Sequence, residues 1–493
     1  MSRTSIFRTI FGVLILSCLL WIFVVTPYQA WRQWNATRAA LVAKGEKLSL
    51  ADFPDPSLRD EENFFADPIW RELSDRELAE TNAGYVHASK VPEDQWQLGA
   101  LRRKSDRAEL EALRADFPEF RTPLANDERL SVLRKIWDQA AKKPEQSRRA
   151  AEITLRALQP GEPMIARIRE LSQRPDASFP LAYEDGMAMR YEHAGILMAA
   201  GQWLELRTRA LLELGDYRAA FQDTILIYRL AETLKRNPLY MTYMVDASLT
   251  DFFTTPIDRG IRIHAWTADE LRAFDRMLAK VDAAKSLAAA LRMERAMMLD
   301  TGWTALGNTA KSGVDPSAGP LASAPFWFYR FVWMPGDKAL YSEIMQKEVE
   351  RLDAVPRQGM NPRFFSPNLV EDYLKKHPTY FVKLSKLVTV LTLPGPIGNA
   401  FQAARTQTIV NLTRTAISLE LYHMEHGEYP ETLAVLKPGA PDGIPLDLIT
   451  GQVFRYTRND DGSFSLWSVG WNEKDENGRI ERKRTDGDWV WGA

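Results

Sequence analysis

The pattern of hydrophobic and polar positions begins with an uncharged apolar run at residues 9–25, TIFGVLILSCLLWIFVV. A run of about 17 residues is at the short end of what spans a bilayer as a helix. Aromatic residues typical of the membrane interface follow it: Tyr28, Trp31 and Trp34. The run therefore predicts a transmembrane segment at residues 9–25, preceded by a short N-terminus at residues 1–8.

Two kinds of cleaved targeting segment, signal peptides and lipoprotein signals, have a composition similar to that of residues 9–25. A signal peptide needs small residues before its cleavage site, but Tyr28 lies two positions before Ala30. A lipoprotein signal would end at Cys18, in ILSC, yet the apolar residues LLWIFVV continue directly after this cysteine. An uncleaved signal anchor therefore fits best, and the lipid bilayer is the expected partner of residues 9–25.

Helical periodicity dominates the next part of the chain. Residues 26–70 include a proline- and acid-rich stretch that predicts an extended lead-in, and residues 71–392 predict an α-helical domain. The clearest part of this domain is a helical pair at residues 201–237, whose LGDY turn offers a glycine and an aspartate N-cap. Further helices are predicted at residues 239–263 and 268–299. One face of the second helix of the pair is formed by residues at helical spacing: Tyr217, Ala220, Phe221, Thr224, Ile225 and Tyr228.

The pattern changes after a break at residues 393–399. Apolar residues at helical spacing predict a long helix from Phe401 that ends at Gly427, and Pro430 opens a short second helix. Residues 400–493 are therefore expected to form a small α+β domain. Its predicted β-hairpin has apolar residues alternating on either side of the turn sequence NDDG: Phe454, Tyr456, Phe464 and Leu466.

Composition and charge narrow the class of function. The 493 residues include 63 lysines and arginines against 65 aspartates and glutamates, so the formal net charge is −2. No nucleic acid partner is expected, because nucleic-acid-binding domains carry a basic surplus or a basic face. Cys18 is the only cysteine, which excludes a disulfide framework and a site built from several thiolates.

Motifs for common catalytic chemistry are absent from the sequence. It contains no GxxxxGK[ST] phosphate loop, no HExxH zinc helix and no GxSxG elbow, so no catalytic residue is assigned. His423 and His426 are three residues apart and could ligate a metal ion together, but the helix dipole alone favours histidines at a helix C-terminus. One further cluster could provide acid–base or metal chemistry, although a polar stripe on a helix surface is the simpler interpretation: Glu184, Asp185, Glu192 and His193.

Short motifs in the C-terminal region follow one order: an LY…G.YP signature, a P.D..TG strand entry, a Y…S.G stretch and an acidic loop that ends in D..W. In this order they resemble the globular domain of the type II secretion major pseudopilins, which are pilin-like subunits. The whole layout also looks similar to uncharacterised bacterial envelope proteins with such a tail. The matching residues are Leu421, Tyr422, Gly427, Tyr429, Pro430, Pro445, Asp447, Thr450, Gly451, Tyr456, Ser468, Gly470, Asp475, Asp486, Asp488 and Trp491.

This resemblance implies a calcium site in the acidic loop, because pseudopilins of this group hold calcium there. Asp475, Asp486 and Asp488 are the matching carboxylates, and oxygen ligands suit this hard cation. The prepilin peptidase site typical of pseudopilins is absent from the N-terminal sequence MSRTSIFRTIFGVLIL. Basic residues of the same loop offer an alternative, since they could neutralise these acids through ion pairs: Arg479, Arg482, Lys483 and Arg484.

Together these patterns predict a mostly α protein with an N-terminal transmembrane helix, an α-helical bundle body and a small α+β pseudopilin-like C-terminal domain. We expect a single-pass protein of the bacterial inner membrane, with a cytoplasmic N-terminus at residues 1–8 and the bulk of the chain extracytoplasmic. This orientation depends mainly on the resemblance, because basic residues flank both ends of the span. The expected function is a scaffold or interaction protein with envelope partners, associated with type II secretion or pilus-like machinery. Two alternatives are an anchored hydrolase using the helical body and a tetratricopeptide-like adaptor, although no 34-residue repeat is found.

Overall fold

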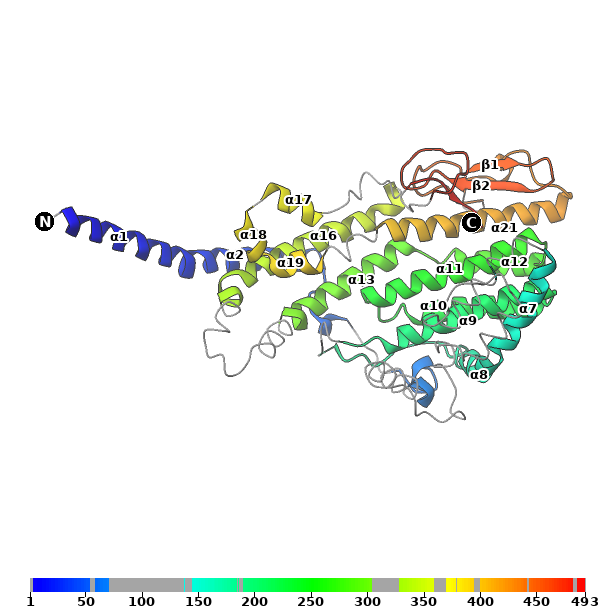
Figure 1. Ribbon diagram of the computed structural model, residues 1–493, viewed down its shortest axis with the longest axis horizontal. Helices are drawn as coiled ribbons and strands as arrows, with labels where there is room; N and C mark the ends of the chain where they lie inside the picture. The colour runs from blue at the N-terminus through cyan, green and yellow to red at the C-terminus, as the bar shows by residue number, and fades with distance from the viewer. Residues whose placement is uncertain are drawn as a thin grey trace.

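The computed structural model describes residues 3–53, 58–70, 137, 144–183, 185, 189–303, 328–358, 369–377, 379–393, 400–440, 443–481 and 486–492. Within these ranges the protein is mostly helical and has one small antiparallel sheet of three strands. Figure 1 shows an elongated molecule: the N-terminal helix projects from one end of a helical body, and the sheet lies over the other end. The predicted mostly α architecture is confirmed at this level.

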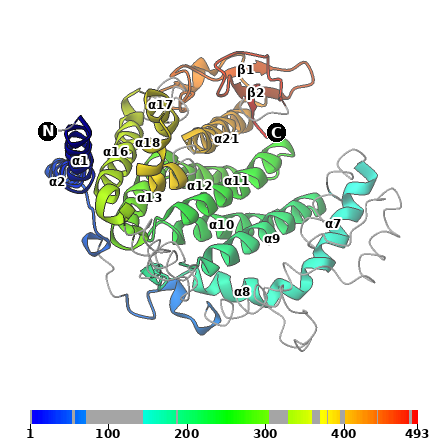
Figure 2. The same ribbon diagram turned by 60° about the vertical axis from the view of Figure 1, so that its left-hand side comes forward.

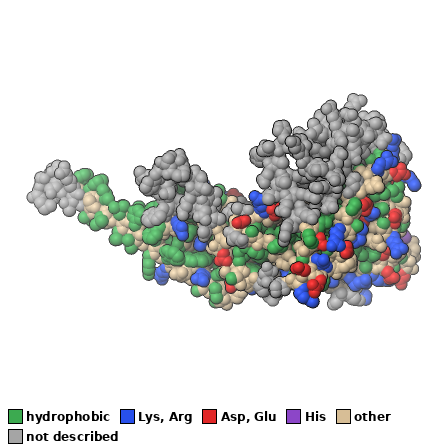
Figure 3. Space-filling view, turned by 90° about the horizontal axis from the view of Figure 1, so that it is seen from below, with side chains coloured by type: hydrophobic (Ala, Val, Ile, Leu, Met, Phe, Trp, Pro, Cys, Tyr) green, Lys and Arg blue, Asp and Glu red, His purple; other side chains and the backbone are tan. Residues whose placement is uncertain are grey.

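A continuous helix forms the N-terminal end. It comprises α1 (Arg3–Leu20), a π-helical turn (Trp21–Val25) and α2 (Thr26–Ala43). Among the described residues, the segment Ile10–Ala43 is the one helix long and apolar enough to span a membrane, and only 6% of its most apolar window is buried. The projecting part has a mainly hydrophobic surface in Figure 3.

The second half of this helix packs on the body. The lead-in predicted at residues 26–70 is helical in its first part, because α2 lies along α16 (Met334–Gln358). The Thr37 hydroxyl donates a hydrogen bond to Glu343 Oε1 of α16 at 2.7 Å. The apolar N-terminal helix and the body are therefore parts of one packed unit.

Further helices make up the body. α9, α10 and α11 pack side by side, and α11 and α13 contact α21. Figure 2 shows these helices between α16 with the N-terminal helix on one side and α7 with α8 on the other. Of the predicted helical domain, residues 71–136 lie outside the described residues. The helices are α7 (Pro144–Leu158), α8 (Glu162–Leu171), α9 (Glu192–Leu214), α10 (Tyr217–Thr233), α11 (Tyr240–Arg262), α12 (Ala268–Leu278), α13 (Ala283–Met297), α16 (Met334–Gln358), α17 (Leu369–Lys376), α18 (Tyr380–Ser385), α19 (Leu387–Thr392) and α21 (Ala400–His426).

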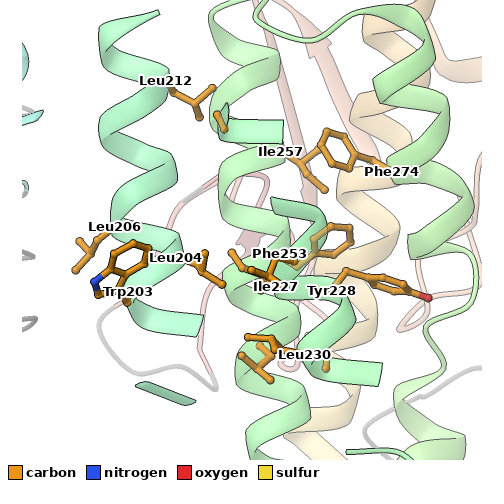
Figure 4. Close-up of a cluster of buried hydrophobic side chains, with 14 of the residues drawn as sticks. Trp203, Leu204, Leu206, Leu212, Ile227, Tyr228, Leu230, Phe253, Ile257 and Phe274 are labelled. Carbon is orange, nitrogen blue, oxygen red and sulfur yellow. The ribbon is translucent and has the colours of Figure 1, made fainter. Parts of the chain in front are cut away.

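Large apolar side chains fill the space between α9, α10, α11 and α12 (Figure 4). Trp203, Ile227 and Phe274 are completely buried. The Phe253 ring lies 5.3 Å from the Tyr228 ring and 6.0 Å from the Phe274 ring, measured between centroids. Because burial of each such side chain contributes roughly 1.5–3 kcal/mol, this core is the main source of stability of the body.

The helical pair predicted at residues 201–237 is present as α9 and α10, although α9 begins earlier. Gly215 adopts a φ of 84° and ends α9, and the Asp216 carboxylate caps the first turn of α10. The predicted face of α10 is buried in part: Ala220 is inaccessible, whereas Tyr217 is 37% exposed. α10 lies between α9 and α11, so its buried surface is wider than a single stripe.

The helix predicted at residues 239–263 is confirmed as α11, but the one predicted at residues 268–299 is two helices, α12 and α13. Asp282 caps α13 by accepting a hydrogen bond from the Lys285 backbone N–H at 2.9 Å. Helical spacing of apolar residues continues across this short interruption, which hid it in the sequence pattern. Asp282 is thus the N-cap at which α13 begins as a separate helix.

The C-terminal region begins with the predicted long helix. α21 ends at Gly427, which adopts a φ of 79° and donates its N–H to the His423 carbonyl at 2.7 Å. Leu433–Leu436 forms a single 3-10 turn in place of the short second helix predicted after Pro430. Lys437 then turns into the left-handed region with a φ of 49°, so the helix cannot continue.

The predicted β-hairpin is confirmed. β1 (Arg455–Arg458) pairs antiparallel with β2 (Phe464–Ser468), and β2 also pairs with β3 (Trp489–Val490). Gly462 adopts a φ of 83° in the turn between the first two strands. The turn residues and the alternation of apolar positions therefore set the register of this sheet.

α21 packs against the preceding helices on one side and carries the sheet on the other (Figure 1). The Thr413 hydroxyl donates to Asp258 Oδ1 of α11 at 2.9 Å, and Arg414 Nε donates to Asp275 of α12 at 2.7 Å. One hydrophobic cluster includes side chains from α9 to α12, α21 and the sheet. The regions on either side of the break predicted at residues 393–399 thus share a core.

Candidate metal centres

The acidic loop between β2 and β3 contains carboxylates predicted to bind calcium. Asp475 accepts hydrogen bonds from Trp467 Nε1 at 3.1 Å, the Asn477 backbone N–H at 3.0 Å and Arg455 Nε at 2.8 Å. These bonds, that of Trp467 foremost, lower the pKa of Asp475. Both of its oxygens therefore have protein donors already.

Asp488 lies deeper in this loop and is only 3% exposed. Its Oδ2 accepts hydrogen bonds from the backbone N–H groups of Gly478 at 2.7 Å and Glu476 at 3.1 Å. Burial raises the pKa of Asp488, these bonds oppose the rise, and the nearby carboxylates of Glu476 and Asp475 add to it. Asp488 Oδ1 and Glu476 Oε2 are buried without a hydrogen-bond partner among the described residues. Two such oxygens in one loop are an arrangement that a bound cation would stabilise.

The third predicted ligand, Asp486, is exposed at the surface. It follows residues 482–485, which lie outside the described residues and include three of the basic residues considered as ion-pair partners. The fourth, Arg479, pairs with Glu481 at 3.0 Å. The structure thus brings Asp475 and Asp488 into one loop and adds Glu476, which was not among the residues that carry the resemblance.

The predicted acid–histidine cluster does not form a shared surface site. The His193 side chain is 1% exposed, stacks on Phe179 at a centroid distance of 4.2 Å and lies edge-on to Phe65 at 5.7 Å. Burial lowers the pKa of His193 to about 3, so the ring is neutral. His193 is therefore not part of a polar stripe on a helix surface, which was the simpler interpretation of the sequence, but a buried side chain packed against aromatic rings. Of the other members, Asp185 is exposed, Glu192 is half-buried, and Glu184 is outside the described residues.

The two histidines at the end of α21 have different surroundings. His426 Nδ1 is 3.0 Å from the Tyr422 carbonyl oxygen, and its ring stacks on Tyr422 at a centroid distance of 3.9 Å. His423 instead stacks on the ring of His264, which follows α11, at 5.0 Å. His426 is therefore a helix-end residue, whereas His423 belongs to a second cluster of potential ligands.

This second cluster consists of His264, Glu420 and His423. One potential ligand atom from each side chain lies within 4.8 Å of the other two. Glu420 is almost completely buried; its Oε1 is 2.7 Å from His264 Nδ1, and its Oε2 accepts a hydrogen bond from the Tyr429 hydroxyl at 2.6 Å. Burial, followed by the bond to Glu420, raises the pKa of Tyr429, so this hydroxyl remains a donor. The cluster is therefore held in place from inside the protein.

His264 has an unusual backbone conformation for a residue with a side chain. Its φ is 53°, its N–H donates to the Ile261 carbonyl at 3.1 Å, and the N–H of Ala265 donates to the Gly260 carbonyl at 2.8 Å. This helix-ending motif normally has glycine at the left-handed position, as with Gly215 after α9. A residue with a Cβ costs about 1–2 kcal/mol there, so the backbone alone does not favour histidine.

His264 and Glu420 were not predicted as partners of His423. Glu420 and His423 are three residues apart on one helix, so their shared face could have been found from spacing alone. His264 is 156 residues from Glu420, and only the packing of α11 on α21 brings them together.

The last residues of the chain close over α11. Trp491 Nε1 donates to Asp258 Oδ1 at 2.5 Å, and Arg262 donates to the carbonyls of Trp491 at 3.1 Å and Gly492 at 2.9 Å. Burial raises the pKa of Asp258 to about 7, against the opposing effect of the Thr413 and Trp491 bonds. A groove of about 650 Å³ beside this contact is lined by residues of α9, α11, α21 and the C-terminal segment.

Comparison with known proteins assigns no family: no family model, no curated protein and no solved structure matches the chain. The function is therefore inferred from the arrangement of the chain's own residues.

Proposed function

We propose that this protein is a single-pass, membrane-anchored scaffold or interaction protein of the bacterial cell envelope. The observation that supports it is the helix Ile10–Ala43, whose first part projects from the body with exposed apolar side chains and whose second part packs on α16. Such a surface is unfavourable in water and stable in lipid, where a helix satisfies its own backbone hydrogen bonds. The helix would hold the body at the membrane surface.

Charged side chains also connect the anchor with the body. Lys44, directly after α2, pairs with Glu350 of α16 at 2.7 Å. Glu46 pairs with the completely buried Arg295 of α13 at 2.5 Å. The anchor therefore joins the body through packed contacts, which suits a protein that presents its body in one orientation to envelope partners.

Apolar residues near the anchor are consistent with contact to the lipid interface. α18 and α19 lie at the end of the body from which the anchor projects (Figure 1). Their leucines Leu384, Leu387 and Leu391 are exposed, the last at 70%. Trp31 and Tyr28 of α2 are exposed as well. Leucine, tryptophan and tyrosine are the side chains that commonly enter the interfacial region of a bilayer.

Placing charges in the anchor is expected to release the protein from the membrane. The double substitution Leu14→Arg, Leu16→Arg adds two charges to the span, and each costs about 2.5–3.5 kcal/mol at the centre of a membrane helix. The wild-type full-length chain should stay in the membrane pellet after alkaline carbonate washing, and the double variant should move to the supernatant. Val435→Arg, at an exposed apolar position in the C-terminal region, is the matched control and should stay in the pellet.

Cells that produce the wild type and these variants also allow the orientation of the body and its protein partners to be tested. We propose that the body lies outside the cytoplasm. Protease added to spheroplasts should then digest the body, and cross-linking in intact membranes should recover envelope proteins with the wild type and Val435→Arg but not with the double variant. Carbonate extraction of the wild type, or a chain shortened at its N-terminus by signal peptidase, would contradict anchoring. A body protected until lysis would reverse the orientation, and absence of any cross-linked partner would count against a scaffold.

The acidic C-terminal loop is proposed to bind calcium, with the protein as a whole stabilised by the ion. The predicted ligands Asp475, Asp486 and Asp488 belong to this loop, and Glu476 is added because its Oε2 and Asp488 Oδ1 have no other described partner. Hard oxygen ligands of this kind are those that calcium prefers. The ion would offset the repulsion between Asp488 and its neighbouring carboxylates.

Calcium is expected to raise the melting temperature of the full-length protein, because a ligand at 100 times its Kd adds about 2.7 kcal/mol to the free energy of unfolding. Asp488→Asn with Glu476→Gln should abolish the shift. Asp269→Asn, at an exposed acid of α12, is the matched control and should retain it. An unchanged melting temperature of the wild type at millimolar calcium would refute the site.

A further inference from the structure

We propose that His264, Glu420 and His423 form a binding site for a divalent transition metal ion, Zn²⁺ foremost. The site is independent of the acidic loop and of the membrane anchor, since none of its residues belongs to either. It joins the end of α11 to the C-terminal part of α21. Two imidazoles and one carboxylate are a donor set that zinc uses with a water molecule in the fourth position.

The distances allow such a centre after a small adjustment. One ligand atom of each residue lies within 4.8 Å of the other two. Zn–N and Zn–O bonds of about 2.0–2.2 Å place tetrahedral ligands roughly 3.3–3.6 Å apart. Glu420 Oε1 and His264 Nδ1 are already 2.7 Å apart and would separate slightly, whereas a rotation of the half-exposed His264 ring would bring it toward His423.

Two of the ligands are positioned by the protein. Glu420 is 1% exposed, and the Tyr429 hydroxyl holds its Oε2, which leaves Oε1 directed to the cluster. The His423 ring lies between the ring of His264 at 5.0 Å and that of Tyr429 at 4.6 Å. A partner of this type, which orients a ligand without touching the metal, is typical of zinc sites. Tyr429 is therefore a positioning residue.

The third ligand is at a position where the backbone would favour glycine. His264 takes the left-handed φ of 53°, and a histidine there gains no stability from the helix-ending motif itself. Its side chain is 52% exposed, so burial of the ring does not explain it either. The contact with Glu420 accounts for one ring nitrogen of His264, whereas a metal ion shared with Glu420 and His423 would account for the position of all three side chains. The exposed side of His264 leaves the fourth position of the ion open to water.

Zinc binding can be measured directly on the full-length protein in detergent micelles. After chelator treatment, Zn²⁺ titrated in competition with a chromophoric chelator should bind with one tight equivalent. Co²⁺ in place of Zn²⁺ should give the intense visible absorption of a tetrahedral site. Both readouts are independent of any activity, and neither requires the membrane or the calcium proposal to be correct.

Substitutions then identify the ligands. Loss of an outer partner typically lowers metal affinity 10–100-fold, so Tyr429→Phe is expected to weaken binding by about 10-fold and His423→Gln by more than about 100-fold. His264→Asn should have the effect of His423→Gln, and it keeps a residue that tolerates the left-handed backbone. His426→Gln, a histidine one turn away that faces Tyr422, is the matched control and should bind as the wild type does.

The outcomes separate the proposal from a purely structural cluster. A cluster that only forms a hydrogen bond and stacked rings would leave the wild type without tight zinc and without the cobalt spectrum, and either result would overturn the site. Equal affinity of the wild type and His423→Gln would also overturn it, because the ion would then bind elsewhere. Circular dichroism of each variant shows whether it has kept its helices, and Tyr429→Phe gives a second test if a ligand variant does not fold.

Discussion

Replacing Glu46 by alanine is expected to lower the free energy of unfolding by about 3–5 kcal/mol, because it leaves a buried arginine without its counter-ion. Arg295 is completely buried, and its guanidinium donates to Glu46 Oε2 at 2.5 Å and to Gln346 Oε1 at 2.7 Å. Arg292 also donates to Glu46 Oε2, at 3.2 Å. Burial would raise the pKa of Glu46, but the bonds from Arg295 and Arg292 lower it, so the carboxylate is ionised. Removal of the Glu46 carboxylate therefore leaves the positive charge of Arg295 without its ion-pair partner.

The loss can be measured by thermal unfolding of the full-length protein, followed by tryptophan fluorescence. Glu350→Ala is the matched control, because the Lys44–Glu350 pair is solvent-exposed and should contribute less than about 1 kcal/mol. Since the pKa of Glu46 is lowered, its stabilisation is present at neutral pH and is lost as the pH falls through its folded-state pKa. The Glu46→Ala variant should accordingly approach the wild type in acid. An equal loss from both substitutions at neutral pH would contradict this role of Glu46.

The apolar N-terminal helix could be predicted from hydropathy, but its packing on the body could not. The run at residues 9–25 has the composition that lipid requires, and this property is local. The helix continues to Ala43 because Thr37 and its neighbours find partners on α16, some 300 residues later. A proline- and acid-rich sequence beyond Ala43 suggested an extended chain for the whole of residues 26–70, and long-range packing reversed this for the first part.

The elements with strong local signals were predictable. The hairpin of α9 and α10, the end of α21 at Gly427 and the turn between β1 and β2 each depend on a glycine or a capping side chain next to them in sequence. The division into domains, in contrast, depends on contacts between residues that are far apart in sequence. A composition change near residues 393–399 suggested separate units, whereas the side chains of α21 complete a core begun by α11 and α12.

The two candidate metal sites also differ in how far they depend on local sequence or on long-range packing. A calcium site in the acidic loop was expected because of the resemblance to the pseudopilins, although which carboxylate oxygens are unpaired depends on the folded backbone. The cluster of His264, Glu420 and His423 is formed by two helices that pack side by side only in the folded chain. His423 alone carried no decisive signal, and its neighbour in sequence, His426, contacts Tyr422 instead, as expected for a helix-end residue.

Both ends of the chain are thus joined to the body by buried charged or polar groups: Glu46 near the anchor and Asp258 beneath the C-terminus. Each of these carboxylates accepts hydrogen bonds from side chains far away in sequence. Burial of such groups is unfavourable unless every partner is in place, so these contacts favour one arrangement of the ends over others. A scaffold that presents its body in a defined orientation would need such a constraint.

Replacing Trp491 by alanine is expected to lower the free energy of unfolding by about 3–5 kcal/mol, the usual cost of removing a buried tryptophan. Its ring is buried, stacks on Phe464 at a centroid distance of 4.7 Å and lies 5.1 Å from the Arg262 guanidinium carbon. Its Nε1 donates to Asp258 Oδ1. The substitution removes the packing and the donor together, and it should expose the groove beside α11 to protease.

Trp491→Phe separates these two contributions, because it keeps most of the ring and removes only the N–H donor; we expect a loss of about 1–3 kcal/mol. The loss should depend on pH. Because the folded-state pKa of Asp258 is raised to about 7, the folded protein holds a proton that the unfolded chain releases, and the stability contributed by this group falls as the pH rises toward 7. Without the Trp491 bond that pKa rises further, so the difference between Trp491→Phe and the wild type should widen from about pH 6 to about pH 8. A difference that is the same at both pH values would show that Trp491 acts by packing alone, and a Trp491→Ala variant as stable as the wild type would refute the contact altogether.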